Sequence, residues 1–300
     1  MAIPGPGTAI SMTTIATEFG GTVPHSLSEY YRGGGLVPNA PANLAIPTSG
    51  QIAMDNFYGS TNRISVPLTI SANSYNYDVY TNRGPTYVAG ISDITVTVNP
   101  GVTVGSTATP TYAMLVPSAF NPADTVTIVN NGVIQAMGGA GGAGSPAGGA
   151  FVAGNTGGST IYVNRPTVIT NNGTVASGGG GGGGGQWGQV VGPKPPKSPA
   201  PVTNYGGGGG GGGAGFNGGA GAAGGSPGGG TGSVGTSPAG GAGGGPAGGP
   251  AGAGGAGGGR GAGGAGGGAG GGAGGATGNY IVGNPFVTWP VNGTRQGNVA

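Results

Sequence analysis

The sequence predicts a mostly β and irregular protein with short N-terminal helical turns, a small β-sandwich-like unit, and β-hairpins that anchor an array of polyglycine-II helices. Three observations lead to this prediction: 82 Gly and 25 Pro among 300 residues, a segment of period-two alternation, and a repeated Asn-Gly motif. Glycine and proline at this level are far from globular composition. We expect three segments: 1–62 for docking, 63–120 as an all-β unit, and 121–300 as the hairpin and glycine-rich domain.

The main glycine-rich stretch, residues 206–278, carries Arg260 as its only charge and almost no side chains that can form a core. An α-helix is disfavoured by roughly 1 kcal/mol for each glycine. A collagen triple helix needs glycine at every third position, whereas the spacing here changes repeatedly. Two alternatives remain. One is a flexible linker, and the other is an ordered array of polyglycine-II helices that bond one another through their backbones.

The composition argues against several function classes. Charged residues make up 5% of the chain and the net charge is +2, which gives no electrostatic footprint for nucleic acid. With no Cys and one His, we expect neither a metal site nor a cofactor. The six carboxylates lie far apart in sequence, and the glycine runs lack the Lys and Ser/Thr of a phosphate-binding loop. We therefore expect a protein that is not an enzyme.

Residues 1–62 contain three short units that each end in glycine: ISMTTIATEFGG, SLSEYYRGGG and IAMDNFYG. Thr13, Ser28 and Asp55 are the expected helix N-caps. Helices this short are unstable alone, so they must pack either on one another or on a neighbouring protein. We favour docking to a neighbour. The expected contact residues are the large apolar side chains Met12, Phe19, Tyr30, Tyr31, Met54 and Phe57.

Residues 63–116 alternate apolar and polar residues, as in RISVPLTI and DITVTVNP, with Asn, Gly and Pro between the runs. This alternation is typical of short strands with one buried face. A sandwich-like arrangement of about five strands is expected here.

A repeat follows this segment. Asn130-Asn131-Gly132 recurs as Asn171-Asn172-Gly173, and a weaker third copy contains Asn292-Gly293. Asn-Gly between two strand-like runs predicts a type I′ hairpin. Such hairpins would anchor the glycine runs at both ends. Because a flexible linker has no need of anchors, the repeat favours the ordered array.

The glycine runs are interrupted by QWGQVVGPKPPKSPAPVTNY, residues 186–205, and by a smaller break at 216–217. An ordered glycine lattice offers few side chains, so recognition must come from its turns, where aromatic residues are the strongest anchors. The candidate receptor-binding residues are therefore Trp187, Lys194, Lys197, Tyr205 and Phe216. In the alternative interpretation, Trp187 only covers the edge of the lattice.

The N-terminal units resemble short modules of bacteriophage tail proteins, and the Asn-Gly motifs with their glycine runs resemble the T-even-type tail-fibre tip adhesins. This resemblance implies a polyglycine-II sandwich with receptor-binding loops at its distal edge. It implies a location in the virion tail after assembly in the host cytoplasm, with other phage tail proteins and a bacterial surface receptor (an outer-membrane protein or a glycan) as partners. A homotrimer is expected by analogy with phage fibres. The alternative is a purely structural minor tail or baseplate protein without receptor contact.

Overall fold

The computed structural model describes residues 3–196 and 198–300, and the chain divides into two compact units. The first unit comprises Met1–Leu68, Arg83–Thr95 and Phe120–Val126, and the second comprises Thr69–Asn82, Val96–Ala119 and Thr127–Ala300. Among the described residues, no helix has the length and apolar character that crossing a bilayer requires.

The N-terminal module, residues 3–62, holds nearly all the helical structure. Its elements are α1 (Met12–Phe19), η1 (Leu27–Glu29), η2 (Pro41–Asn43) and η3 (Met54–Phe57). They enclose a small side-chain core of Ile3, Ile15, Phe19, Tyr30, Val37, Ile46 and Phe57. The short helices are therefore stabilised by packing on one another.

The helix starts differ from the expected ones. Ser11 caps α1 and Ser26 caps η1, each accepting a hydrogen bond from a backbone N–H, while Ala53 precedes η3. The predicted cap Asp55 lies two residues after Ala53, and the predicted caps Thr13 and Ser28 lie two residues after Ser11 and Ser26. Ser and Thr occur at both positions, so residue type alone does not separate them.

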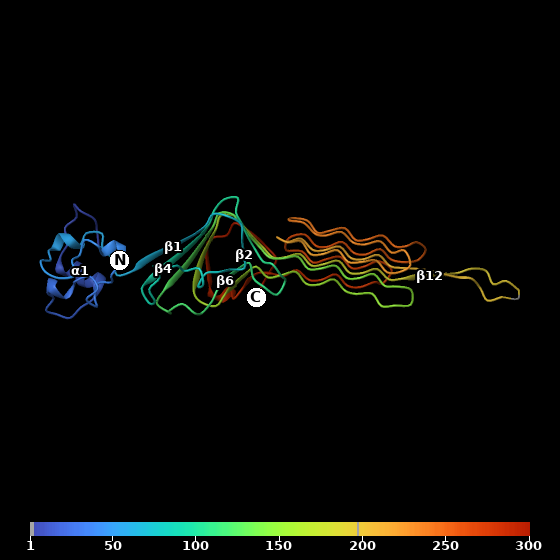
Figure 1. Ribbon diagram of the computed structural model, residues 1–300, viewed down its shortest axis with the longest axis horizontal. Helices are drawn as coiled ribbons and strands as arrows, with labels where there is room; N and C mark the ends of the chain where they lie inside the picture. Colours follow the sequence, from blue (N-terminus) through green and yellow to red (C-terminus); the bar gives the residue numbers. More distant parts are fainter. Residues whose placement is uncertain (1–2, 197) are drawn as a thin grey trace. The chain divides into compact units, whose positions relative to one another are not determined.

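The rest of the chain is built on parallel sheets (Figure 1). The first sheet has the order β1-β4-β7-β10-β15, the second β16-β11-β8-β5-β2, and the third β17-β14-β9-β6-β3. The strands are β1 (Ile64–Ile70), β2 (Ser74–Tyr75), β3 (Tyr77–Asp78), β4 (Ser92–Val98), β5 (Thr103–Gly105), β6 (Met114–Val116), β7 (Thr125–Asn130), β8 (Val133–Gln135), β9 (Ile161–Val163), β10 (Thr167–Asn171), β11 (Thr174–Ala176), β14 (Asn279–Val282), β15 (Val287–Val291), β16 (Thr294–Gln296) and β17 (Asn298–Val299); η4 is Asn284–Phe286.

Three consecutive strands occupy the three sheets in turn, and this cycle repeats along the chain, so the sheets form a three-sided parallel solenoid. The prediction of a mostly β and irregular chain is confirmed, but two details of it are wrong. Residues 63–120 supply β1 to β6, the first two coils, rather than a sandwich. The Asn-Gly motifs are corners between sheets rather than hairpins, because β7 and β8 belong to different sheets.

The corner geometry explains the repeated motif. The Nδ2 of Asn130 donates to the Oδ1 of Asn171 at 2.8 Å, and Asn171 in turn donates to the carbonyl oxygen of Asn292 at 2.9 Å. Both side chains are fully buried. A Cβ on Gly173 would lie 2.0 Å from the Gly132 carbonyl oxygen. The motif is therefore a ladder of asparagines with glycine where stacked coils approach closely.

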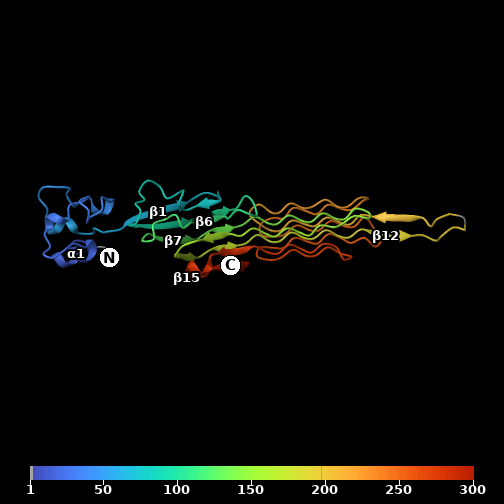
Figure 2. The same ribbon diagram turned by 90° about the horizontal axis from the view of Figure 1, so that it is seen from below.

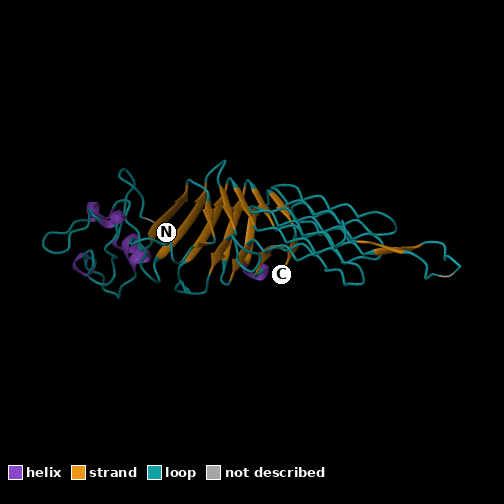
Figure 3. Cartoon of the chain, turned by 45° about the vertical axis from the view of Figure 1, so that its right-hand side comes forward, coloured by secondary structure: helices purple, strands orange, loops and turns teal. Residues whose placement is uncertain are grey.

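The glycine-rich segments leave this solenoid and return to it. One leaves between β8 and β9, and the other between β11 and β14. They form extended runs that lie side by side (Figure 3), joined by backbone hydrogen bonds. These runs, called here the array, are 138–145, 152–158, 178–186, 206–215, 217–225, 229–236, 239–247, 251–258, 262–268 and 271–278. Ordered structure, and not a linker, is the correct alternative.

The bonds in the array follow a period of three residues. In the run 178–186, Gly179, Gly182 and Gly185 all donate to the run 206–215, at 2.8 Å each. The residues between them donate to two other runs. This is what a helix with three residues per turn and no internal hydrogen bonds requires.

Two segments of the array, 178–185 and 206–213, consist of glycine alone and are called here the enclosed runs. Each exchanges hydrogen bonds with six other runs. For 178–185 these are 138–145, 152–158, 206–215, 251–258, 262–268 and 271–278. A Cβ on Gly182 would lie 2.0 Å from the Gly255 carbonyl oxygen. Glycine is thus needed at every position of a run that has neighbours on all sides.

Candidate functional site

The distal end of the array, opposite the solenoid, carries an antiparallel hairpin that projects beyond the runs (Figure 2). Its strands are β12 (Gly188–Val191) and β13 (Val202–Tyr205). They pair from Gly188 with Tyr205 to Val191 with Val202, and a proline-rich loop closes the hairpin. The described residues of the hairpin, together with Trp187, are called here the distal hairpin (residues 187–196 and 198–205).

The base of the distal hairpin is fixed to the array by two of the predicted residues. The backbone N–H of Trp187 donates to the Oγ of Ser145 at 2.6 Å. The ring of Tyr205 packs over the turn at Gly249, where an added Cβ would lie 2.6 Å from a ring carbon. Both aromatic side chains are half-buried. The structure thus brings Trp187 and Tyr205 to the same end of the array.

Two predicted lysines, Lys194 and Lys197, belong to the loop between β12 and β13 in the sequence. Lys194 is exposed in the loop between β12 and β13. Lys197 lies outside the described residues. No Asp or Glu occurs after Asp124 in the sequence, so the charge that the array and its hairpin present is positive.

Exposed apolar residues at this end were missed by the sequence analysis. Val190, Val191 and Val202 are 43%, 58% and 51% exposed on the distal hairpin. Phe151 lies in the neighbouring turn after Ser145, Val152 begins the run 152–158 that follows this turn, and both are exposed. The sequence contains a signal for this exposure. Around Val190-Val191 and Val202, apolar and polar residues do not alternate regularly, and polar and proline residues flank them, as expected of a two-stranded hairpin without a buried face.

Phe216 lies elsewhere. It follows the run 206–215 at the proximal end of the array, and its ring meets that of Tyr75 edge-to-face at 5.2 Å between centroids. The ring also covers Gly105 of β5, where an added Cβ would lie 2.3 Å from a ring carbon. Phe216 is therefore separate from the distal hairpin and packs on the solenoid.

The N-terminal docking candidates divide into buried and accessible ones. Phe19, Tyr30 and Phe57 lie in the core of the module, and Phe57 contacts the other two edge-to-face at 6.3 Å and 6.2 Å. Their aromatic surface is used within the module because helices this short need mutual packing. The other candidates, Met12, Tyr31 and Met54, are half-buried.

Large apolar side chains that sequence reasoning did not select are exposed on the module. Val23 is 84% exposed and Leu44 is 64% exposed. Neither is part of a periodic pattern, so the sequence alone does not single them out. Their exposure adds to the apolar surface that Met12, Tyr31 and Met54 leave accessible on the module.

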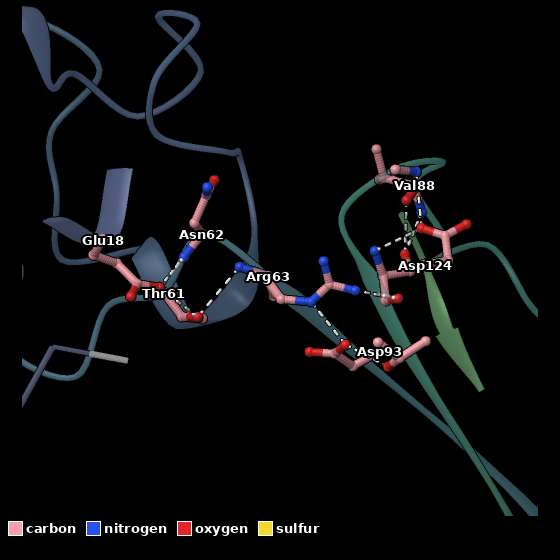
Figure 4. A network of polar contacts seen from close by, with 10 residues as sticks. Glu18, Thr61, Asn62, Arg63, Val88, Asp93 and Asp124 are labelled. Carbon is pink, nitrogen blue, oxygen red and sulfur yellow. Dashed lines mark hydrogen bonds and ion pairs between the residues drawn. The ribbon is translucent and has the colours of Figure 1, made fainter. Parts of the chain in front are cut away.

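Acidic side chains in the first unit have structural partners (Figure 4). The Oε1 of Glu18 accepts from the backbone N–H of Asn62 at 2.7 Å, which ties α1 to the segment entering β1. Asp93 pairs with Arg63 at 2.7 Å. Asp124, almost fully buried, accepts from the backbone N–H of Ser92 at 3.0 Å. Within residues 3–196 and 198–300, no group of three or more His, Asp or Glu side chains is placed to hold a metal ion.

Comparison with known proteins gives the family. A family model described as phage tail fibre adhesin Gp38 matches residues 65–300. No curated protein matches. Among solved structures, the chain is similar to one in the gp37–gp38 adhesin tip complex of the bacteriophage S16 long tail fibre, with 21% identity, 100% of each chain covered and a TM-score of 0.49. The match over residues 65–300 includes every coil of the solenoid and the whole array, and this chain therefore belongs to the Gp38 family of phage tail fibre adhesins.

Proposed function

We propose that the distal hairpin, with the adjoining Phe151 and Val152, is the part of this tail fibre adhesin that contacts the bacterial surface. The observation that carries the proposal is the set of exposed valines on a hairpin that extends past the array. Apolar side chains gathered at one exposed place mark interaction sites in soluble proteins. The receptor is an outer-membrane protein or a glycan.

The array has few free hydrogen-bonding groups, and this supports host contact by the distal hairpin. Its backbone donors and acceptors bond neighbouring runs, so few groups remain for a receptor. The period-three bonding supports our proposal that the array is a polyglycine-II lattice that serves as a rigid platform. Specific contacts then have to come from side chains at the distal end, including Trp187, Lys194 and Tyr205, with no catalytic step involved.

Static adsorption of phage to host cells tests the proposal. Val191→Thr with Val202→Thr keeps the β-branched shape that strands favour but removes apolar surface from both members of a cross-strand pair. We expect weaker adsorption. Val234→Thr, at a site 62% exposed on an outer run of the array, is the matched control and should adsorb as wild type. Unchanged adsorption of the hairpin variant would favour the purely structural role.

The N-terminal module is proposed to attach the chain to other proteins of the tail. Its exposed Val23 and Leu44 support this, since neither is used in the core of the module. Leu44→Asp should yield a folded adhesin that fails to enter virions, while Val234→Asp enters normally. Normal incorporation of Leu44→Asp would contradict the attachment role. The homotrimer is part of the same proposal, and sedimentation equilibrium of the purified chain tests it.

A further inference from the structure

The distal hairpin and the enclosed runs form one continuous piece of chain. β11 leads into the run 178–185, which leads into β12; β13 then leads into the run 206–213. The hairpin thus emerges from the two segments that exchange hydrogen bonds with six other runs each. The turn at Ser226-Pro227, in contrast, joins the two outer runs 217–225 and 229–236.

Tension on the hairpin would act along the enclosed runs. The hydrogen bonds of these runs point sideways to their neighbours, as from Gly182 to Gly211 and from Gly183 to Ala265. Sliding a run along its own axis therefore loads its sideways bonds together. The outer run 229–236 exchanges hydrogen bonds with three runs and not six, namely 206–215, 217–225 and 239–247, so it can peel away bond by bond. Each bond contributes only about 0.5–1.5 kcal/mol net, so resistance depends on their acting together.

The proximal ends of both enclosed runs are fixed. The run 178–185 continues from β11, which lies between β8 and β16 in the second sheet and buries Val175 completely. The run 206–213 ends close to Phe216, whose ring packs on Tyr75. A Cβ on Gly213 would lie 2.0 Å from the Gly179 carbonyl oxygen. The space that the run 206–213 occupies between its neighbours therefore has no room for a methyl group, and the ring of Phe216 cannot be drawn into it.

We propose that the enclosed runs are a mechanical link that carries tension from the distal hairpin into the solenoid, with Phe216 as the stop that prevents the run 206–213 from sliding outward. This inference rests on the proposed function, because it requires the hairpin to be the point of host contact. The link gives the adhesin a second role: it holds a virion to the cell under load. Forced unfolding is governed by the rate of unfolding, not by the equilibrium stability.

Single-molecule pulling on the full chain tests the link. One handle is an N-terminal tag, and the other is a cysteine introduced as Ser198→Cys in the hairpin loop, unique because the chain has no Cys. A second variant carries Val234→Cys on the outer run 229–236 instead. We expect a high-force rupture from the hairpin handle and a lower-force, stepwise one from Val234. Equal first-rupture forces from the two handles would overturn the load path.

Phe216 is tested with the hairpin handle and a C-terminal tag in place of the N-terminal one, because the tension then passes along the run 206–213 and reaches Phe216. Phe216→Ala should lose the high-force event, while Phe216→Leu, which keeps a bulky side chain, should retain it. Phe286→Ala, at a side chain 44% exposed near the C-terminus, is the matched control. Rupture of Phe216→Ala at the wild-type force would overturn the role of the stop. In phage, this variant should adsorb normally at rest and detach under flow.

Failure of the link and failure of the proposed function give different results. The Val191 and Val202 double variant should reduce static adsorption and leave the rupture force unchanged. If that variant adsorbs as wild type, the host-contact proposal fails whatever the forces are. If it adsorbs poorly but the two handles rupture alike, the host-contact proposal stands and the mechanical link is overturned.

Discussion

The N-terminal module and the glycine array are held together in opposite ways. The module buries Phe19, Tyr30 and Phe57 around a small apolar core, and its backbone is mostly short helical turns. The array has almost no side chains to bury, and its runs are joined by backbone hydrogen bonds with a period of three. The first depends on side chains that fill space, and the second on side chains that are absent.

This contrast predicts opposite sensitivities to mutation. Removing atoms from the module leaves a cavity, which the surrounding side chains can partly close. Adding one carbon atom to an enclosed run brings it against a carbonyl oxygen of a neighbouring backbone, which cannot move without breaking its own hydrogen bonds. Interiors packed this closely transmit such strain.

The largest expected effect is that of Gly182→Ala. The new Cβ would lie 2.0 Å from the Gly255 carbonyl oxygen, so the enclosed run and its neighbours have to separate. We expect loss of protected amides over 178–185 and 206–213, measured by hydrogen exchange with mass spectrometry. Gly266→Ala is the control, since the nearest atom to its Cβ would be 3.6 Å away, an ordinary contact. Equal protection in the two variants would show that the runs are not close-packed.

The matching change in the module is Phe57→Ala. It removes a fully buried ring that contacts Phe19 and Tyr30, so unfolding of the module should become easier by about 3–5 kcal/mol. Chemical denaturation followed by near-ultraviolet circular dichroism measures this. Amide protection over 178–185 should stay as in wild type. If the array lost its protection too, its order would depend on the core of the module.

The asparagine ladder should give an intermediate effect. Asn171→Ala leaves the Asn130 amide without one acceptor and the carbonyl of Asn292 without a donor, and unsatisfied buried polar groups cost about 1–3 kcal/mol each. The melting temperature should fall. Asn172→Ala removes an exposed side chain next to it and should change stability by less than about 0.5 kcal/mol. Equal melting temperatures for the two variants would mean that the ladder adds nothing.

The smallest effect concerns the module at alkaline pH. Burial of the Tyr30 side chain raises its pKa above the ordinary value of 10.0, and the charge of Glu29 adds to this. The unfolded chain therefore releases this proton first. Stability is unaffected below the unfolded pKa and falls as pH rises through the folded pKa. Tyr30→Phe should weaken this pH dependence in denaturation series from pH 8 to pH 11, and an unaltered dependence would assign it to other groups.

The Asn-Gly motifs show which part of the fold can be predicted from the sequence. The Asn130 and Asn171 motifs were recognised as anchors of the glycine runs, but their geometry was predicted wrongly. A hairpin and a solenoid corner both place Asn-Gly between two strands, and only pairing across coils separates them. Gly132 and Gly173 are not among the glycines with positive φ, which a type I′ turn would need. Close stacking of the coils, and not turn conformation, requires them.

Two features follow from the order of residues alone: the glycine-rich stretches have no side-chain core, and the repeated anchors argue for order. The irregular glycine spacing that excluded collagen also has a simple origin. Ala253 and Ala256, or Ala273 and Ala276, keep a spacing of three within a run and are exposed, and the spacing changes at the turns between runs. The alanines at this spacing therefore indicate which face of an outer run meets solvent.

The fold, by contrast, shows which runs are enclosed, and it places Phe216 at the proximal end of the array and the valines of the distal hairpin at the distal end. The physical reason is that the enclosed runs differ from the rest by their number of neighbours. Hydrogen bonds such as that from Gly180 to Ala262 join residues far apart in the chain. A period of three fixes the directions in which a run can bond, but the fold determines which run occupies each direction.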